Sequence, residues 1–475
     1  MAAILTDKFR VVFAEKFRQM ISLGENQAIL DLGIPPTTLW LFFAKSAEWE
    51  NGIPIDPVDN QRSKYDIYDQ IIGLKKITSS EIRPMIRNNS WQSGSTYDIY
   101  RDNYGDISST QGSIVNYVQS LNFEQHLYET NFYVVTSEYK IYKCLNNAKN
   151  GQSTVEPSST SNAPFTLSDG YTWKYLFTVN ANDFEKFKTD EYIPIPEDTA
   201  IDPNNVIAAD SNNFGGAIYN ILIDAPGSGY QSGQEFDITG DGSNGVVRVI
   251  STNDQGGITS VKIVNPGTAY TYAQINTTGG QNAVLQPIIS PKEGMGARIG
   301  RELGAYRLAL HAKLDKDDFV FGNDFSVVGL LNDPTLTTNG SIAIGTKQLT
   351  LSSPLVNNQD TYNDKRIRDT VTGATGRIVH YEPDTTSQIY TIFYTQENIL
   401  NFGIDSQGIR RDFEPGNPIL VGNTGQEGAT IATGLNSVKD SELKRGSGEI
   451  IYIDNRNTIS RAEDQTEDFK IILEF

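Results

Sequence analysis

The sequence is short of the two residues that most often bind metals, with one cysteine and three histidines in 475 residues. A single cysteine excludes an intrachain disulfide framework and fits a reducing cytoplasm. Cys144 in "IYKCLNN" is therefore predicted to be a buried small residue among strand apolar residues. His126, His311 and His380 are dispersed and have no cysteine neighbours, so the sequence predicts no metal site.

The sequence also lacks long apolar runs and an excess of positive charge. No segment approaches the roughly 18 apolar residues of a membrane span, and the basic stretch Met1 to Ile21 lacks the unbroken apolar core of a signal peptide. We therefore expect neither a membrane partner nor export by that route. The net charge of -19 disfavours a protein that follows nucleic-acid phosphates with a basic face.

Motifs for catalysis and cofactor binding are missing as well. No "GxSxG" and no cysteine-histidine pairing marks a nucleophile, and "GSGYQSG" at 227–233 lacks the helix and lysine of a phosphate loop. "GDGSNG" at 240–245 could hold a cation weakly through Asp241, although a glycine-rich hairpin turn explains the same residues. Paired carboxylates for glycan cleavage stay open, because the spacing of acids in space cannot be taken from sequence. No cofactor or small-molecule substrate is predicted.

What is present indicates several cores, mostly of β structure. One amphipathic helix follows Thr6, with Phe9, Val12, Phe13, Phe17, Met20 and Ile21 on the stripe predicted to dock on its own domain. "LWLFFAKSAEW" from Leu39 predicts a strand buried on both faces. All four tryptophans precede residue 174, which places an aromatic-rich core there.

Two glycine-rich zones follow a different pattern. Residues 206–297 contain an internal repeat, in which "ILIDAPGSGY" at 221–230 returns 40 positions later as "VKIVNPGTAY" at 261–270. Each copy predicts a strand that runs into a Pro-Gly turn with a tyrosine packed over it. Residues 336–440 contain further short strands with glycine corners, typical of a small barrel or sandwich.

The simplest organisation is one core domain that carries two β inserts. The core would consist of residues 1–205, 298–335 and 441–475, the first insert of 206–297 with its twofold repeat, and the second of 336–440. The predicted fold class is mainly β with a few helices: a layered β-sandwich core with two inserted small β modules.

The C-terminal stretch "KRGSGEIIYIDNR" at 444–456 concentrates glycines, acids and basic residues around four apolar residues. Its two glycines lead into a strand and not a helix, which removes a phosphate-loop interpretation. Glu449 and Asp454 are five positions apart, so on one continuous strand they would point to opposite faces and could not pair. An architectural role is therefore predicted.

"SGEIIYIDNR" followed by "AEDQTEDFKIILEF" resembles the C-terminus of the gene-eight baseplate wedge subunit family of T4-like contractile-tailed bacteriophages. "TDKFR", "LFFAKSAEW", "IRPMIRNNSW", "YKCL", "DGYTWKYLF" and "EYIPIPED" agree in order, and "AYRLALHAKLD" and "FSVVGLLNDP" resemble the late core strands of the family. The resemblance covers about 1–205, 298–335 and 441–475. After Asn455 and Arg456 the family pattern has two prolines, where this chain has Asn457 and Thr458.

The resemblance implies a non-enzymatic virion protein of the tail baseplate, made and assembled in the host cytoplasm. It implies a homodimer within each wedge that links other wedge proteins during baseplate assembly and contraction of the tail. A tail-associated glycan-binding or glycan-degrading protein is the alternative, favoured by the tyrosine-bearing repeat and the many acids. The candidate signature residues are Trp40, Trp49, Trp91, Trp173, Tyr175, Gly448, Glu449, Tyr452, Asp454, Asn455, Arg456, Asp464 and Gln465.

Overall fold

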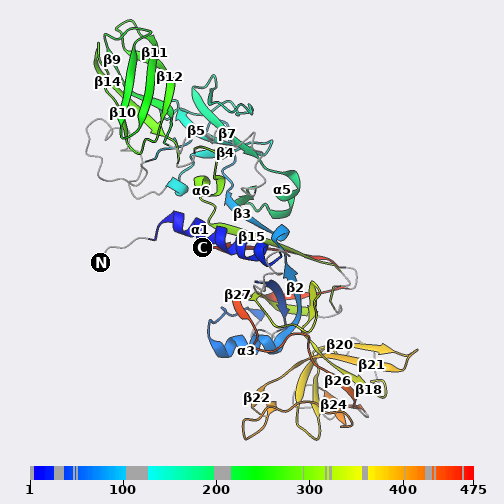
Figure 1. Ribbon diagram of the computed structural model, residues 1–475. Coiled ribbons are helices and arrows are strands. Elements are labelled where there is room, and N and C mark those ends of the chain that lie inside the picture. The colour runs from blue at the N-terminus through cyan, green and yellow to red at the C-terminus, as the bar shows by residue number, and fades with distance from the viewer. Residues whose placement is uncertain are drawn as a thin grey trace. The chain divides into compact units, whose positions relative to one another are not determined.

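The computed structural model divides the chain into two compact units (Figure 1). Unit 1 contains Met1–Lys16, Arg83–Ala309 and Ile472–Phe475, and unit 2 contains Phe17–Ile82 and Leu310–Ile471. The residues described are 5–25, 37–45, 49, 52–102, 127–196, 216–291, 294–315, 318–319, 324–355, 362–400, 402–422, 430–432, 435–462 and 465–475. Strands dominate them, which confirms the predicted mainly β class. The predicted core contributes residues to both units, and its bounds and those of the inserts stay predictions.

Unit 1 is built around an antiparallel sheet in the order β4-β5-β7-β6. One face carries Cys144, Trp173 and their aromatic neighbours, and the other packs on a large cluster that includes Phe132 and Leu303. The sheet is therefore covered on both faces, as a layered architecture requires. The elements around it are β3 Ile82–Arg87, η3 Leu127–Glu129, β4 Tyr133–Val135, β5 Lys140–Asn147, β6 Phe165–Thr166, β7 Tyr171–Thr178, α5 Ala181–Phe187, β8 Tyr192–Pro194 and α6 Ile299–Leu303.

The repeat zone of unit 1 forms six strands, two sets of three related by the 40-residue offset. They are β9 Ile218–Ser228, β10 Glu235–Gly240, β11 Ser243–Thr252, β12 Ile258–Thr268, β13 Ala273–Ile275 and β14 Gln281–Ile289. The first strand of each set pairs with the last strand of the other set, β9 with β14 and β12 with β11. The two copies are therefore interlocked around one shared apolar cluster.

The repeated Pro-Gly pairs do not end their strands, contrary to the sequence prediction. Gly227 and Gly267 have φ angles of 62° and 65° and lie inside β9 and β12. Because glycine adopts positive φ without a steric penalty, each pair bends its strand and pairing continues beyond it. The repeated tyrosines do pack inward: both Tyr230 and Tyr270 are buried, and the Tyr270 hydroxyl donates to the Ile238 carbonyl over 2.7 Å.

Unit 2 contains a five-stranded sheet in the order β17-β2-β1-β16-β27. All six residues of β1 are buried, because Trp40 and Phe42 pack into one cluster while Phe43 contacts Phe325 and Phe469 from the other face. Asn60 caps α3 by accepting a hydrogen bond from the Ser63 N–H. The elements are β1 Leu39–Ala44, α3 Gln61–Gln70, β2 Ile71–Ile77, η2 Ser79–Glu81, β16 Asp324–Asn332, β17 Ile342–Ile344 and β27 Glu449–Ser460.

A seven-stranded sheet, also in unit 2, has the order β25-β24-β19-β20-β21-β18-β26. Its end strands β25 and β26 follow each other closely along the chain, so the sheet curls until its two ends approach. The strands are β18 Lys347–Leu351, β19 Arg366–Asp369, β20 Thr375–Asp384, β21 Ile389–Gln396, β24 Ile419–Gly422, β25 Thr430–Ala432 and β26 Leu435–Lys439, and the short pair beside them is β22 Ile399–Leu400 and β23 Gly403–Ile404.

Four elements contain residues of both units: α1 Asp7–Gly24, β3, β15 Arg307–Leu314 and β28 Glu467–Glu474. The predicted buried stripe of α1 is wrong in part, since Phe9, Phe13 and Met20 are exposed while Val11 and Ala14 are buried with Ile21. The smaller Val11 and Ala14 let the helix backbone approach its support, which hydrophobicity alone does not indicate. Among the described helices, none is long and apolar enough to span a membrane.

Candidate functional site

The turn at 444–448 lies between two structural partners, α3 and the segment after β16. The Arg445 guanidinium donates to both carboxylate oxygens of Asp69, over 2.5 and 2.7 Å. The Tyr68 hydroxyl donates to the Ser447 carbonyl over 2.8 Å. The Ser447 hydroxyl oxygen accepts from the Thr335 N–H over 2.9 Å. The turn is thus attached to both segments by its side chains and its backbone.

Two glycines make this turn possible. Gly446 and Gly448 have φ angles of 72° and 70°, which favour glycine. A Cβ on Gly448 would lie 2.3 Å from the Asn332 carbonyl oxygen, and a Cβ on Gly446 would lie 2.7 Å from the Tyr65 ring. Burial, and then the nearby Tyr65 hydroxyl and Glu449 carboxylate, raise the pKa of Tyr68 to about 12. Its hydroxyl therefore stays a hydrogen-bond donor at neutral pH.

A β-bulge changes the faces on which the two motif acids lie. Tyr452 lies opposite Leu330 and Ile450 opposite Leu331, so Ile451 is an extra residue in β27. On β16, Glu449 lies opposite Asn332 and Asp454 lies opposite Val328. These two partners are four residues apart, an even number, so the two acids lie on the same face of the sheet. The predicted opposite orientation is wrong, because a bulge shifts the alternation by one residue. The two acids are still separated by roughly 13 Å along the strand.

Past the bulge, the motif holds a neighbouring segment of chain. The Arg456 Nε donates to Asp454 Oδ2 over 2.7 Å, and both side chains are partly exposed. The Arg456 carbonyl accepts from the Trp49 indole over 2.8 Å, and the Asn455 side-chain amide donates to the Ile55 carbonyl over the same distance. These three contacts give the predicted signature residues an architectural use.

The remaining predicted residues are divided between the two units. In unit 1, Trp173 and Tyr175 lie in one buried cluster, and the Trp91 indole donates to Ser153 over 3.0 Å. In unit 2, Trp40 of β1 shares an apolar cluster with Ile450 of the motif, and the Gln465 side chain accepts from the Ala462 N–H over 3.2 Å. Asp464 lies outside the described residues.

Asp241, the candidate for a weak cation, instead holds the connection between β12 and β13. Its carboxylate accepts hydrogen bonds from the Thr271 hydroxyl and from the backbone N–H groups of Thr271 and Tyr272. These bonds, the hydroxyl first, lower its pKa to about 2. The described residues include no group of three or more His, Cys, Asp or Glu side chains that could hold a metal ion.

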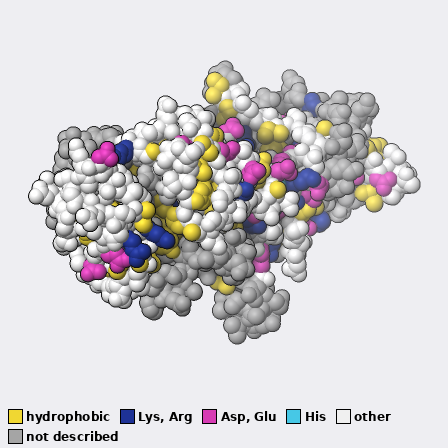
Figure 2. Space-filling view, turned by 90° about the horizontal axis from the view of Figure 1, so that it is seen from above, with side chains coloured by type: hydrophobic (Ala, Val, Ile, Leu, Met, Phe, Trp, Pro, Cys, Tyr) yellow, Lys and Arg dark blue, Asp and Glu magenta, His cyan; other side chains and the backbone are white. Residues whose placement is uncertain are grey.

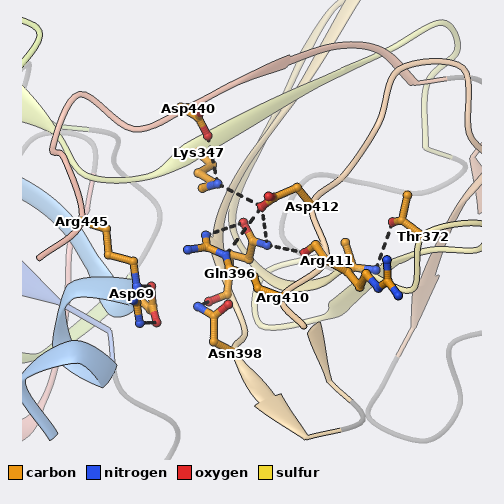
Figure 3. Close-up of polar contacts among 11 residues, drawn as sticks. Asp69, Lys347, Thr372, Gln396, Asn398, Arg410, Arg411, Asp412, Asp440 and Arg445 are labelled. Carbon is orange, nitrogen blue, oxygen red and sulfur yellow. Dashed lines mark hydrogen bonds and ion pairs between the residues drawn. The ribbon is translucent and has the colours of Figure 1, made fainter. Parts of the chain in front are cut away.

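A second polar network, which sequence reasoning missed, lies in unit 2 at the end of β21 (Figure 3). The buried Gln396 amide donates to the Arg411 carbonyl and to Asp412, and its oxygen accepts from Arg410 over 3.0 Å. Lys347 pairs with Asp440 over 2.9 Å and lies 3.7 Å from Asp412. The network joins β18, β21 and the loop before β24. Its members are spread from 347 to 440, so no local sequence motif predicts the network.

Residues 391–475 match the family model of Gp8 of bacteriophage T4. This match confirms the recognition for the C-terminal part of the chain, which contains β27, the turn at 444–448 and most of the Gln396 network. It begins inside 336–440, the segment that the sequence motifs left without a counterpart in the family, so the likeness extends further than those motifs indicated. Among curated proteins, none matches the chain.

Proposed function

We propose that the protein is a structural component of a phage tail baseplate wedge that links neighbouring subunits. One observation carries the proposal: the part that matches Gp8 contains a motif in which Arg445, Ser447 and Asn455 hold other chain segments in place. Such contacts fit a part whose function is to keep a fixed shape. The proposed role in wedge assembly and in tail contraction rests on the same match to Gp8 and the same contacts.

The geometry of the motif acids favours a non-enzymatic role. Retaining and inverting glycosidases hold their two carboxyl groups about 5 to 9.5 Å apart. The Cα atoms of Glu449 and Asp454 lie roughly 13 Å apart along β27, a wider backbone spacing than such a carboxyl pair calls for. The glycan-degrading alternative therefore loses this pair as its catalytic acids.

Two further features belong to the proposal. We expect the protein to be a homodimer, which a light-scattering mass of twice the chain mass at micromolar concentration would support. We also expect it to reside in the virion tail after assembly in the host cytoplasm. A stable monomer would remove the first expectation without touching the second.

The decisive experiment is to locate the protein in purified particles. Mass spectrometry of isolated tails, followed by labelling of a C-terminal tag in electron micrographs, should find the chain at the baseplate. Its absence from tails, or its presence only at the tail fibres with hydrolysis of host surface glycans, would overturn the proposal.

A further inference from the structure

The segment that the signature residues hold is the most exposed apolar stretch described in unit 2. We define the arm as Gly52–Asn60, "GIPIDPVDN". Ile53, Ile55 and Val58 are 68, 60 and 54 % exposed. Single apolar side chains commonly reach a protein surface, as Figure 2 shows for the face it draws. Three exposed apolar side chains within six residues are unusual for an extended segment that binds no partner.

The arm is also stiff and anchored. Pro54 and Pro57 fix their own φ angles and keep the residues before them extended. The Asn455 amide holds the Ile55 carbonyl, Trp49 binds the Arg456 carbonyl just before the arm, and Asn60, the last residue of the arm, caps α3. A pre-organised segment loses little conformational entropy when it binds, which favours a docking role over a loose loop.

Charge indicates what kind of surface would receive the arm. Asp56 and Asp59 lie among the exposed aliphatic residues, and the arm contains no Lys or Arg, although Lys64 of α3 pairs with Asp59 over 2.8 Å. A groove that accepts it needs an apolar floor and a basic rim. A second copy of this chain, with a net charge of -19, is disfavoured as the receptor.

We propose that the arm is a docking element that places Ile53, Ile55 and Val58 in an apolar, basic-rimmed groove of a different protein in the same assembly. The proposal rests on the proposed baseplate function and names the surface through which one neighbour is bound. It also gives Asn455 and Arg456 their purpose, which is to present the arm.

The test uses phage that lack this gene, grown on cells that supply the wild-type chain or a variant. The arm variant is I53S/I55S/V58S, and its matched control is V371S/I389S/I409S, which makes the same three exchanges at exposed sites elsewhere in unit 2. We expect at least a tenfold loss of the arm variant from purified tails, with normal incorporation of the control. Thermal unfolding should be the same for both variants as for the wild type.

A photo-crosslinking residue at Ile55 identifies the receptor and decides the outcome even if the triple variant misfolds. We expect a cross-link to another tail protein, and weaker incorporation of Asp56→Lys. Normal incorporation of the arm variant, or a cross-link to a second copy of the chain, would overturn the inference and leave the baseplate function intact. Wild-type protein missing from tails would remove both.

Discussion

Lys143 on β5 lies directly opposite Lys174 on β7, and both side chains are buried. Glu302, also buried, forms an ion pair with Lys143. Lys174 donates to the Asn162 carbonyl and adds a second cation near the same carboxylate. Burying two ammonium groups against one carboxylate is costly, because like charges across a strand pair repel and neither is hydrated.

We predict that this lysine pair makes unit 1 more stable at alkaline pH. Burial first, and then the charge of Lys143, lower the pKa of Lys174 to about 8 from its ordinary 10.5, although Glu302 opposes the shift. Below pH 8, Lys174 is protonated in both the folded and the unfolded state, and the full free-energy cost of burying its charge is present. Between pH 8 and 10.5 only the folded state loses the proton, so stability rises, by about 3 kcal/mol at roughly 1.4 kcal/mol per pKa unit.

The measurement is the difference in unfolding free energy between the wild type and Lys174→Met as a function of pH. Taking this difference cancels the contribution of the buried tyrosines to the pH dependence, since both proteins contain them. Lys174→Met should be more stable at pH 7 and lose that advantage by pH 10. The exposed Lys262→Met in the same unit serves as control and should show no such trend. A difference that stays constant with pH would contradict the prediction.

Gly448→Ala should destabilise unit 2 by about 2 kcal/mol or more. The new Cβ would be 2.3 Å from the Asn332 carbonyl oxygen, and the left-handed backbone adds about 1 to 2 kcal/mol. Gly373→Ala is the matched control, since its φ is 81° but no atom lies within 4 Å of the added Cβ. Denaturant unfolding should give a larger loss for Gly448→Ala, and equal losses would show that the close contact has no cost.

The two arginines of the motif should differ in importance. Arg445→Ala leaves Asp69, only 10 % exposed, without its bidentate partner and should cost about 1.5 to 3 kcal/mol. Arg456→Ala breaks a pair whose side chains are 39 and 27 % exposed and should cost about 0 to 1 kcal/mol. Chemical denaturation of both variants tests the order, which a larger loss for Arg456→Ala would reverse.

Replacing residues 218–289 with a short Gly-Ser linker should leave the rest of unit 1 folded but less stable. The ends of the segment meet, because the Ser290 N–H donates to the Ala217 carbonyl over 2.9 Å. The deletion also removes Leu222 and Ile288 from the main cluster of unit 1. Loss of large buried side chains costs about 2 to 5 kcal/mol each. Calorimetry should show one cooperative transition at lower temperature, and loss of cooperativity would contradict the insertion scheme.

The sequence by itself determined the features that depend on local pattern. The mainly β class follows from short β-prone runs between turn signals, and the double burial of Leu39–Ala44 follows from its continuous apolar run. The repeat is visible because duplicated strands keep the same residues at the same spacing. The C-terminal motif is also visible in the sequence, because its residues are contiguous.

Only the tertiary structure decided how distant segments meet. Arg445 and Asp69 are 376 positions apart, and nothing local in either indicates the other. One bulge at Ile451 moved Glu449 and Asp454 to a common face, since pairing register depends on the partner strand. Packing likewise determines which face of α1 is buried: Val11 and Ala14 are buried, whereas Phe9 is exposed. Sequence pattern fixes what each segment can form, whereas register and packing against remote residues select which side chains meet.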